Sequence, residues 1–162
     1  MNKLLLAAAA ATVLSATPAL AQDTAAAATF TGPRIGANVG FADDSIFGTE
    51  AFTYGAEVGY DVAVGNAVLG ITGEVQDNKD IKRELALTGR AGARVGSNAL
   101  LYVTGGYSNI RAYGENIDGV RVGLGGELAI GSNAFAKVEQ RYGNYQYGIE
   151  LYQSLLGFGF RF

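Results

Sequence analysis

The feature that most constrains this chain is a regular alternation between apolar side chains and either glycine or charged side chains. It is clearest in residues 52–64, where Phe, Tyr, Ala and Val fill the even positions and Thr, Gly, Glu and Asp most of the odd ones. A period of two residues places the two classes on opposite faces of a β-strand. Eight stretches show this pattern and predict eight strands: residues 30–41, 52–64, 67–76, 83–95, 99–108, 119–130, 134–142 and 150–162.

A short repeat marks the turns between three pairs of these strands. An apolar residue, Gly, Asn, Ala and a second apolar residue, in two cases with an inserted Ser, occupy residues 64–68, 95–100 and 130–135. Gly and Asn tolerate the positive φ that tight hairpin turns require. The sequence therefore predicts three tight turns at one end. The longer connections, roughly residues 42–51, 77–82, 109–118 and 143–149, are expected at the other end.

The polar faces of the predicted strands carry charges of both signs together with many glycines. An eight-stranded barrel has an interior just wide enough for side chains to fill, and charges buried there must be paired. The mixed charges therefore predict a polar interior and an apolar outer surface in contact with lipid. Arg34 and Asp61 lie on these polar faces. The predicted interior ion-pair network consists of Glu57, Glu74, Glu84, Arg90, Arg94, Arg121, Glu127, Lys137, Glu139, Arg141 and Arg161.

The reverse assignment of the faces is energetically unfavourable. Arg90 or Arg121 turned toward lipid at the middle of a bilayer would cost roughly 2–4 kcal/mol each. Two polar residues, Arg83 and Gln140, nevertheless fall on the apolar faces. Arg83 lies at a strand end, where it can reach water, whereas the sequence offers no reason for Gln140. Outward aromatic residues near both strand ends are typical of membrane barrels: Phe41, Phe52, Tyr54, Tyr107 and Tyr142 at one end, Phe160 and Phe162 at the other.

The first residues have the composition of a secretory signal peptide. A basic start, an apolar run and the small-residue pattern Ala19-Leu20-Ala21 follow one another in the expected order. We expect residues 1–21 to be removed on export through the general secretory pathway, residues 22–29 to be flexible and residues 30–162 to form the barrel. The chain has no cysteine and a net charge of −3, so it lacks disulfides and is a poor partner for nucleic acid. Without a long apolar run in residues 22–162, it could cross a membrane only as a closed barrel.

The end of the chain resembles the C-terminal assembly signal of bacterial outer-membrane barrels. Residues 157–162 read GFGFRF; Gly157, Phe160 and Phe162 match that signal, whereas Leu155 stands at a position that is polar in the family. Residues 135–142 are similar to the seventh-strand motif of the small outer membrane protein β-barrel domain family, which is related to opacity proteins and to the barrel of outer-membrane protein A.

The resemblance covers residues 30–162 and implies an all-β fold, an eight-stranded antiparallel up-and-down transmembrane β-barrel of the porin family. It also implies a location in the Gram-negative outer membrane, with outer-membrane lipid as a partner. During biogenesis, periplasmic chaperones and the barrel-assembly machinery would be further partners. That machinery would recognise Gly157, Phe160 and Phe162.

Catalytic and metal-binding chemistry has little support in the composition. The chain has no histidine and no cysteine, which removes Ser-His and Cys-His nucleophiles and the usual zinc ligands. Paired glutamates could still act as acid and base, but interior ion pairs are the favoured explanation of Glu57, Glu74, Glu84, Glu127 and Glu139. Residues 77–80 lack the glycine and the terminal glutamate of a calcium loop. We therefore expect no enzyme, no cofactor and no metal.

Three functions are compatible with these features. The first is a structural or surface-interaction barrel that supports envelope integrity or adhesion, with its lumen closed by ion pairs and a host or surface ligand at the extracellular loops. The second is a narrow porin-like channel for small solutes, and the third is a lipid-modifying enzyme. We expect the first. A soluble lipocalin-like barrel, the competing fold, would require apolar residues inside.

Overall fold

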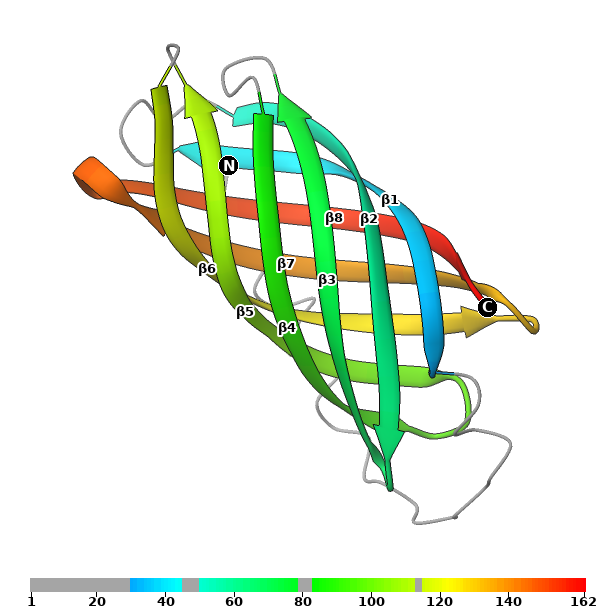
Figure 1. Cartoon of the computed structure of the whole chain (residues 1–162). Helices are drawn as coiled ribbons and strands as arrows, with labels where there is room; N and C mark the ends of the chain where they lie inside the picture. Colours follow the sequence, from blue (N-terminus) through cyan, green and yellow to red (C-terminus); the bar gives the residue numbers. More distant parts are fainter. Residues whose placement is uncertain (1–29, 45–49, 79–82, 113–114) are drawn as a thin grey trace, which may run out of the picture.

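Eight antiparallel strands close into one barrel in the computed structural model, which describes residues 30–44, 50–78, 83–112 and 115–162 (Figure 1). Each strand pairs with its neighbours in the sequence, and β1 pairs with β8 to close the ring. The predicted fold class is therefore confirmed. The strands are β1 (Gly32–Asp44), β2 (Glu50–Val64), β3 (Ala67–Asn78), β4 (Arg83–Val95), β5 (Ala99–Ala112), β6 (Glu115–Ile130), β7 (Ala134–Tyr145) and β8 (Ile149–Arg161).

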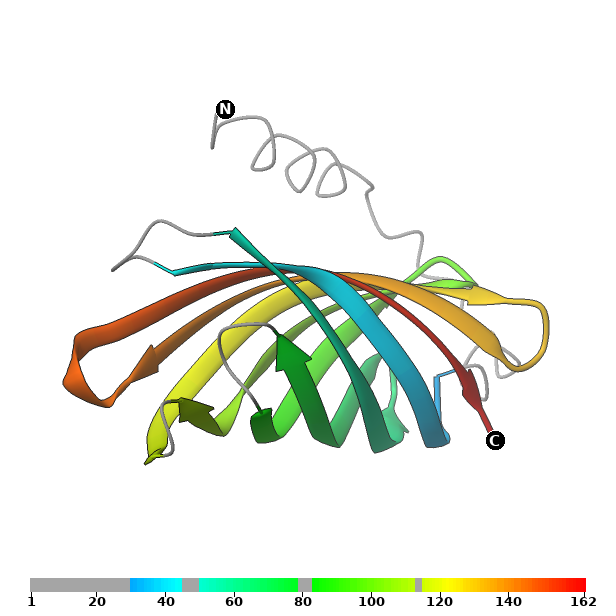
Figure 2. The same ribbon diagram turned by 90° about the horizontal axis from the view of Figure 1, so that it is seen from above.

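Outside the strands, a short 3₁₀ turn, η2 (Gln146–Gly148), connects β7 to β8. No helix in the described part of the chain is long and apolar enough to span a membrane. The predicted signal peptide, residues 1–21, and the predicted flexible segment, residues 22–29, lie outside the described residues. Seen from above, the strands of the two sides slant across one another (Figure 2), as the strand tilt of a closed barrel requires.

The two ends of the barrel carry different connections. At the turn end, at the lower right of Figure 1, lie the three tight turns, the start of β1 and the end of β8. The other four connections lie at the opposite end, which we call the outer end. Gly65, Gly96 and Gly131 open the tight turns with φ values of 61°, 68° and 64°. These values fall in the left-handed region that favours glycine, as the turn repeat predicts.

The asparagines of these turns do not have the role predicted for them. Among the described residues, only Tyr147 has a positive φ without being glycine. The side-chain amide of Asn66 instead donates to the carbonyl of Arg94 at 3.3 Å, and that of Asn133 to the carbonyl of Arg161 at 3.0 Å. Asn66 and Asn133 therefore connect their turns to the adjacent strand rather than supplying an unusual backbone angle.

The faces of the strands have the predicted polarity. Outward Val58 and Val122 are 58% and 55% exposed, whereas inward Glu57 and Arg121 are 1% and 4% exposed. We call the part of the barrel whose outward residues are apolar the apolar band. Inward glycines make room for large interior side chains: a Cβ on Gly125 would lie 2.6 Å from a ring carbon of Tyr102.

The third predicted long connection, residues 109–118, is wrong. β5 continues to Ala112 and β6 begins at Glu115, with Ile110 opposite Ile117 in the register. The alternation continues here with its polarity reversed, so that the isoleucines are inside and polar residues are outside. We call this region the outer collar; it comprises residues 42–43, 109–111, 116–118, 144–145 and 149–151. Its buried cluster consists of Ala42, Ile110, Ile117, Tyr145 and Leu151, against which Ile149 packs.

Candidate functional site: an ion-pair network inside the barrel

Asp61 and Glu127 organise the part of the interior nearest the turn end. Arg90 bridges them, with Nη2 2.6 Å from Asp61 Oδ2 and Nη1 2.8 Å from Glu127 Oε2. Arg161 bridges the same two carboxylates, and its Nη1 lies 3.0 Å from Asp61 Oδ2. Arg34 Nε adds a contact of 3.2 Å to the same oxygen. Asp61 is thus shared by arginines of β1, β4 and β8, which lie far apart in the sequence.

Glu57 and Glu139 form the middle of the network. Glu57 accepts from Arg34 and from Lys137, two cations on different strands. Lys137 also lies 3.5 Å from Glu139 Oε2, and Arg141 Nε lies 2.6 Å from Glu139 Oε1. These pairs connect β1 and β2 to β7 across the interior of the barrel.

Glu74 and Glu84 form the part nearest the outer end. Arg121 bridges them, with Nη2 2.7 Å from Glu74 Oε2 and Nη1 3.1 Å from Glu84 Oε1. Arg141 Nη1 lies 2.7 Å from Glu74 Oε1, which joins this part to the middle. Three neutral donors complete the shell of Glu84: Ser108 Oγ at 2.7 Å, Tyr145 Oη at 3.1 Å and Gln153 Nε2 at 3.1 Å.

The charges of this network balance. Six carboxylates face six cations, all nearly inaccessible to solvent. Taking ions out of water is tolerable only with such close partners and further hydrogen bonds. A void at the centre of the network, lined by residues that include Arg34, Glu74 and Lys137, has a volume of about 10 Å³. That is room for one water molecule at most.

Apolar clusters lie beyond the network at both ends. At the turn end, Phe30, Val68, Leu100 and Tyr102 form a buried cluster. The guanidinium carbon of Arg161 lies 5.7 Å from the ring centre of Phe30, within cation–π distance. The buried cluster of the outer collar occupies the opposite end. The ions are therefore enclosed along the barrel axis as well as around it.

Ten of the eleven predicted network residues lie in the network, and Arg94 does not. Its guanidinium donates to the carbonyl of Gly65 at the turn end, and it forms no salt bridge with any described residue. The reason is its place near the end of β4, opposite Leu100, where the apolar cluster already fills the interior. The prediction for Arg94 was therefore wrong.

Two central members, Arg34 and Asp61, were absent from the predicted network although their alternation placed them on the polar face. The hydroxyl donors Tyr102 and Tyr145 were missed as well. Tyr102 donates to Glu139 Oε2 at 2.8 Å, and its inward position follows from the same alternation. Tyr145 lay in a predicted loop, so no strand pattern was available to place it.

The predicted assembly residues occupy different surroundings. Gly157 faces inward, where a Cβ would lie 2.6 Å from Lys137 Cε, so glycine makes room for the network here. Phe160 and Phe162 are outward and exposed. Recognition of these three residues by an assembly machinery stays a prediction.

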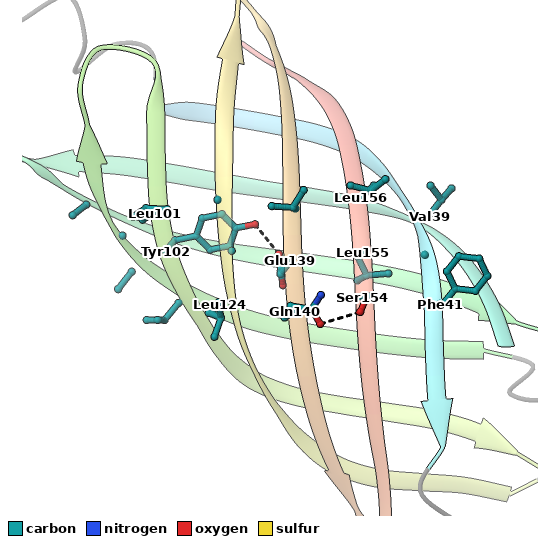
Figure 3. Close-up of a pocket in the computed structure, with 18 of the residues that line it drawn as sticks. Val39, Phe41, Leu101, Tyr102, Leu124, Glu139, Gln140, Ser154, Leu155 and Leu156 are labelled. Carbon is teal, nitrogen blue, oxygen red and sulfur yellow. Dashed lines mark hydrogen bonds between the residues drawn. The ribbon is translucent and has the colours of Figure 1, made fainter. Parts of the chain in front are cut away.

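The outer surface carries one polar pair within an apolar groove. Ser154 Oγ donates to Gln140 Oε1 at 2.9 Å across β7 and β8. Figure 3 shows this pair beside Glu139, which lies on the opposite face of β7 and accepts from Tyr102. The groove around the pair includes Val39, Phe41, Leu124 and Leu156. Gln140, unexplained by the sequence, therefore has a cross-strand partner.

The network offers no free acid and base. Each of its carboxylates contacts at least one cation. In the ranges that the structure describes, no three acidic residues gather where they could hold a metal ion. The expectations of no enzyme and no cofactor rest on the sequence and stay predictions.

Comparison with known proteins assigns the family. The model described as "Outer membrane protein beta-barrel domain" matches residues 6–162. The chain belongs to this family. Membership implies a location in the bacterial outer membrane, whereas the route of export stays a prediction. No curated protein matches the sequence.

Solved structures share the fold at low sequence identity. Neisserial surface protein A aligns with a TM-score of 0.60 and 14% identity, over 82% of this chain and 98% of that one. The N-terminal β-barrel domain of Pseudomonas aeruginosa OprF gives 0.59 and 18%, over 82% and 99%. The attachment invasion locus protein Ail of Yersinia pestis gives 0.57 and 13%, over 82% and 97%. These likenesses support the eight-stranded barrel.

Proposed function

We propose that this protein is a closed outer-membrane barrel with a structural and surface-interaction role, in envelope integrity or adhesion, rather than a pore. The observation that carries the proposal is the balanced network of six carboxylates and six cations, with an apolar cluster at each end. An interior filled in this way leaves no continuous path for a hydrated ion.

The outer end is where we place the interaction with other surfaces. In barrels of this type the longer connections face the exterior and the short turns face the periplasm. The outer collar, with its own buried apolar cluster, extends the strands beyond the apolar band on this side. The name of one structural neighbour, attachment invasion locus protein, is in keeping with such a role. A host or surface ligand at these connections is part of the proposal.

Planar-bilayer recording distinguishes the closed barrel from the narrow porin-like channel. We expect the purified, folded protein to give no steady single-channel steps. Steady steps that disappear when Arg90 or Glu127 is replaced would overturn the closed-barrel proposal. Arg94→Gln is the matched control, since Arg94 lies outside the network.

Two further measurements test location and enzymatic activity. We expect fractionation to recover the protein in outer membranes, with a gel mobility that changes on heating. Incubation with lipid A or phospholipid, followed by mass spectrometry, should give no new product. A modified lipid would instead favour the lipid-modifying enzyme.

A further inference from the structure

Two arginines face each other on the outer surface at the outer end of the barrel. Arg83 begins β4 and lies opposite Arg111 near the end of β5. Their sequence neighbours Glu84 and Ile110 are buried in the interior, so both arginines belong to the outward face. Like charges directly opposite each other on neighbouring strands repel and destabilise the pair. The arrangement is therefore unfavourable unless an anion lies between them.

No carboxylate among the described residues forms a salt bridge with either guanidinium; Asp77 of β3, one position beyond the Gln76–Glu84 pair, lies beside Arg83 without forming one. Within the described part of the chain, neither guanidinium forms a hydrogen bond or a salt bridge, and the Nε of Arg83 is shielded from solvent without a partner. Asp118, a carboxylate on the same face, accepts from the Tyr107 hydroxyl and, at 2.7 Å, from the Asn109 amide. All six cations inside the barrel, by contrast, have carboxylate partners.

The depth of the pair indicates what its ligand is. Leu85 is the next outward residue after Arg83 on β4, whereas on β5 the outward Asn109 separates Arg111 from Tyr107. Leu85 and Tyr107 end the apolar band on these two strands. Tyrosine rings concentrate at the membrane interface, and arginine side chains extend from such positions toward lipid headgroups. The guanidinium groups therefore lie at headgroup level, given the orientation in the proposed function, on which this inference rests.

We infer that Arg83 and Arg111 together bind the phosphate of a lipid headgroup in the outer leaflet. Guanidinium groups suit this ligand because each presents two parallel N–H donors to phosphate oxygens. One phosphate between two such groups removes their mutual repulsion and gives the unpartnered donors of Arg83 an acceptor. A phosphorylated glycolipid, with its phosphate next to its acyl chains, matches the position of the site at the edge of the apolar band.

Binding of lipid A that carries two phosphates to the folded protein in neutral detergent tests the inference, with native mass spectrometry as the readout. We expect Arg83→Gln with Arg111→Gln to weaken binding about thirtyfold, since each arginine at a charged membrane surface contributes about fivefold. Replacing both by lysine should retain part of the affinity, because charge is kept and the paired donors are lost. Arg94→Gln, at the turn end, should bind as the unmodified protein does.

Two ligand controls identify the source of the phosphate. The same lipid without phosphates should bind weakly to the unmodified protein, and millimolar inorganic phosphate should not displace lipid A. Equal binding of the two lipids, equal binding by the double glutamine variant, or displacement by inorganic phosphate would each overturn the inference.

Failure of this inference is separable from failure of the proposed function. Every variant is first checked for heat-dependent gel mobility, which reports a folded barrel. If the protein fractionates outside the outer membrane, the proposed function fails and the orientation used here fails with it. If the protein resides in the outer membrane and the double variant binds lipid A normally, only the lipid site is lost.

Discussion

The apolar band and the outer collar are built from the same strands but have opposite polarity. In the band, charged side chains fill the interior and apolar ones face outward. In the collar, Ile110 and Ile117 are buried while Asn109, Arg111 and Asp118 face outward. The change occurs within single strands without a break in pairing. The inward half of the alternation is buried at both levels, and what changes between them is whether that half is charged or apolar.

The energetic basis of the interior also differs between the two regions. The band depends on charge pairing, in which the loss of one partner leaves an uncompensated buried ion. The collar depends on burial of apolar surface, as in a soluble protein. Substitutions should therefore have effects that depend on the level at which they are made. The following measurements use urea titration of the protein folded in phospholipid vesicles, with the folded fraction read from unheated gel mobility.

The largest loss of stability is expected from Asp61→Asn. This change leaves three arginines, Arg34, Arg90 and Arg161, close together with one carboxylate fewer. We expect the free energy of unfolding to fall by about 3–5 kcal/mol. Asp77→Asn is the control, because Asp77 is partly exposed and forms no salt bridge with a described residue. Equal losses for the two variants would contradict the role of the network.

An arginine introduced on the outer surface should lower stability more in the apolar band than in the collar. Val103→Arg places a charge on the lipid face of β5 and should cost roughly 2–4 kcal/mol. Asn144→Arg makes the same addition on the outward face of the collar, where it should change stability by about 0.5 kcal/mol or less. If the two variants were equally stable, the position of the lipid boundary would be wrong.

Truncation of an apolar side chain should lower stability more in the collar than in the apolar band. Ile110 is 1% exposed in the collar, and Ile110→Ala should cost roughly 2–3 kcal/mol through the cavity it leaves. Val120→Ala removes an outward side chain of the apolar band and should cost about 1 kcal/mol or less. A larger effect at Val120 than at Ile110 would show that the collar has no apolar core of its own.

The smallest effect, with the opposite sign, is expected on the lipid face. Gln140→Leu combined with Ser154→Ala removes a polar pair from contact with lipid and should stabilise the barrel by up to about 1 kcal/mol, since a hydrogen bond within a membrane contributes only about 0.6 kcal/mol. The inward Gln153→Leu should instead destabilise it by about 1–3 kcal/mol, because Glu84 loses a donor. Destabilisation by the outward double variant would instead show that the Gln140–Ser154 hydrogen bond contributes more to stability than contact of the pair with lipid costs.

Much of the fold follows from the sequence because one rule, the two-residue period, acts on every strand. The rule places Glu57, Arg90 and Glu127 inside without further information. It failed at residues 109–118, where the apolar residues change faces and the alternation was interpreted as a loop. A pattern that assumes lipid outside at every level cannot describe a strand that extends beyond the bilayer.

The partners within the network could not be derived in the same way. Alternation states that Asp61 is inside, but not that it meets Arg161, which is 100 residues away in the sequence. Such contacts depend on the stagger of the strands around the ring. For Arg94 the alternation predicted the correct face of the strand. It could not show at which level along the barrel axis the interior changes from charged to apolar. The lipid-facing Gln140 was explained only when the register placed Ser154 opposite it.

Closure of the ring through β1 and β8 has a consequence for assembly of the barrel. β8 carries Arg161, which contacts Asp61 and Glu127 in addition to Arg90. Until β8 pairs, both margins of the sheet have unsatisfied peptide groups, and Asp61 and Glu127 each lack one of their cations. A sheet without β8 therefore lacks both its edge pairing and part of its interior charge balance, and the pairing of β1 with β8 supplies the two together.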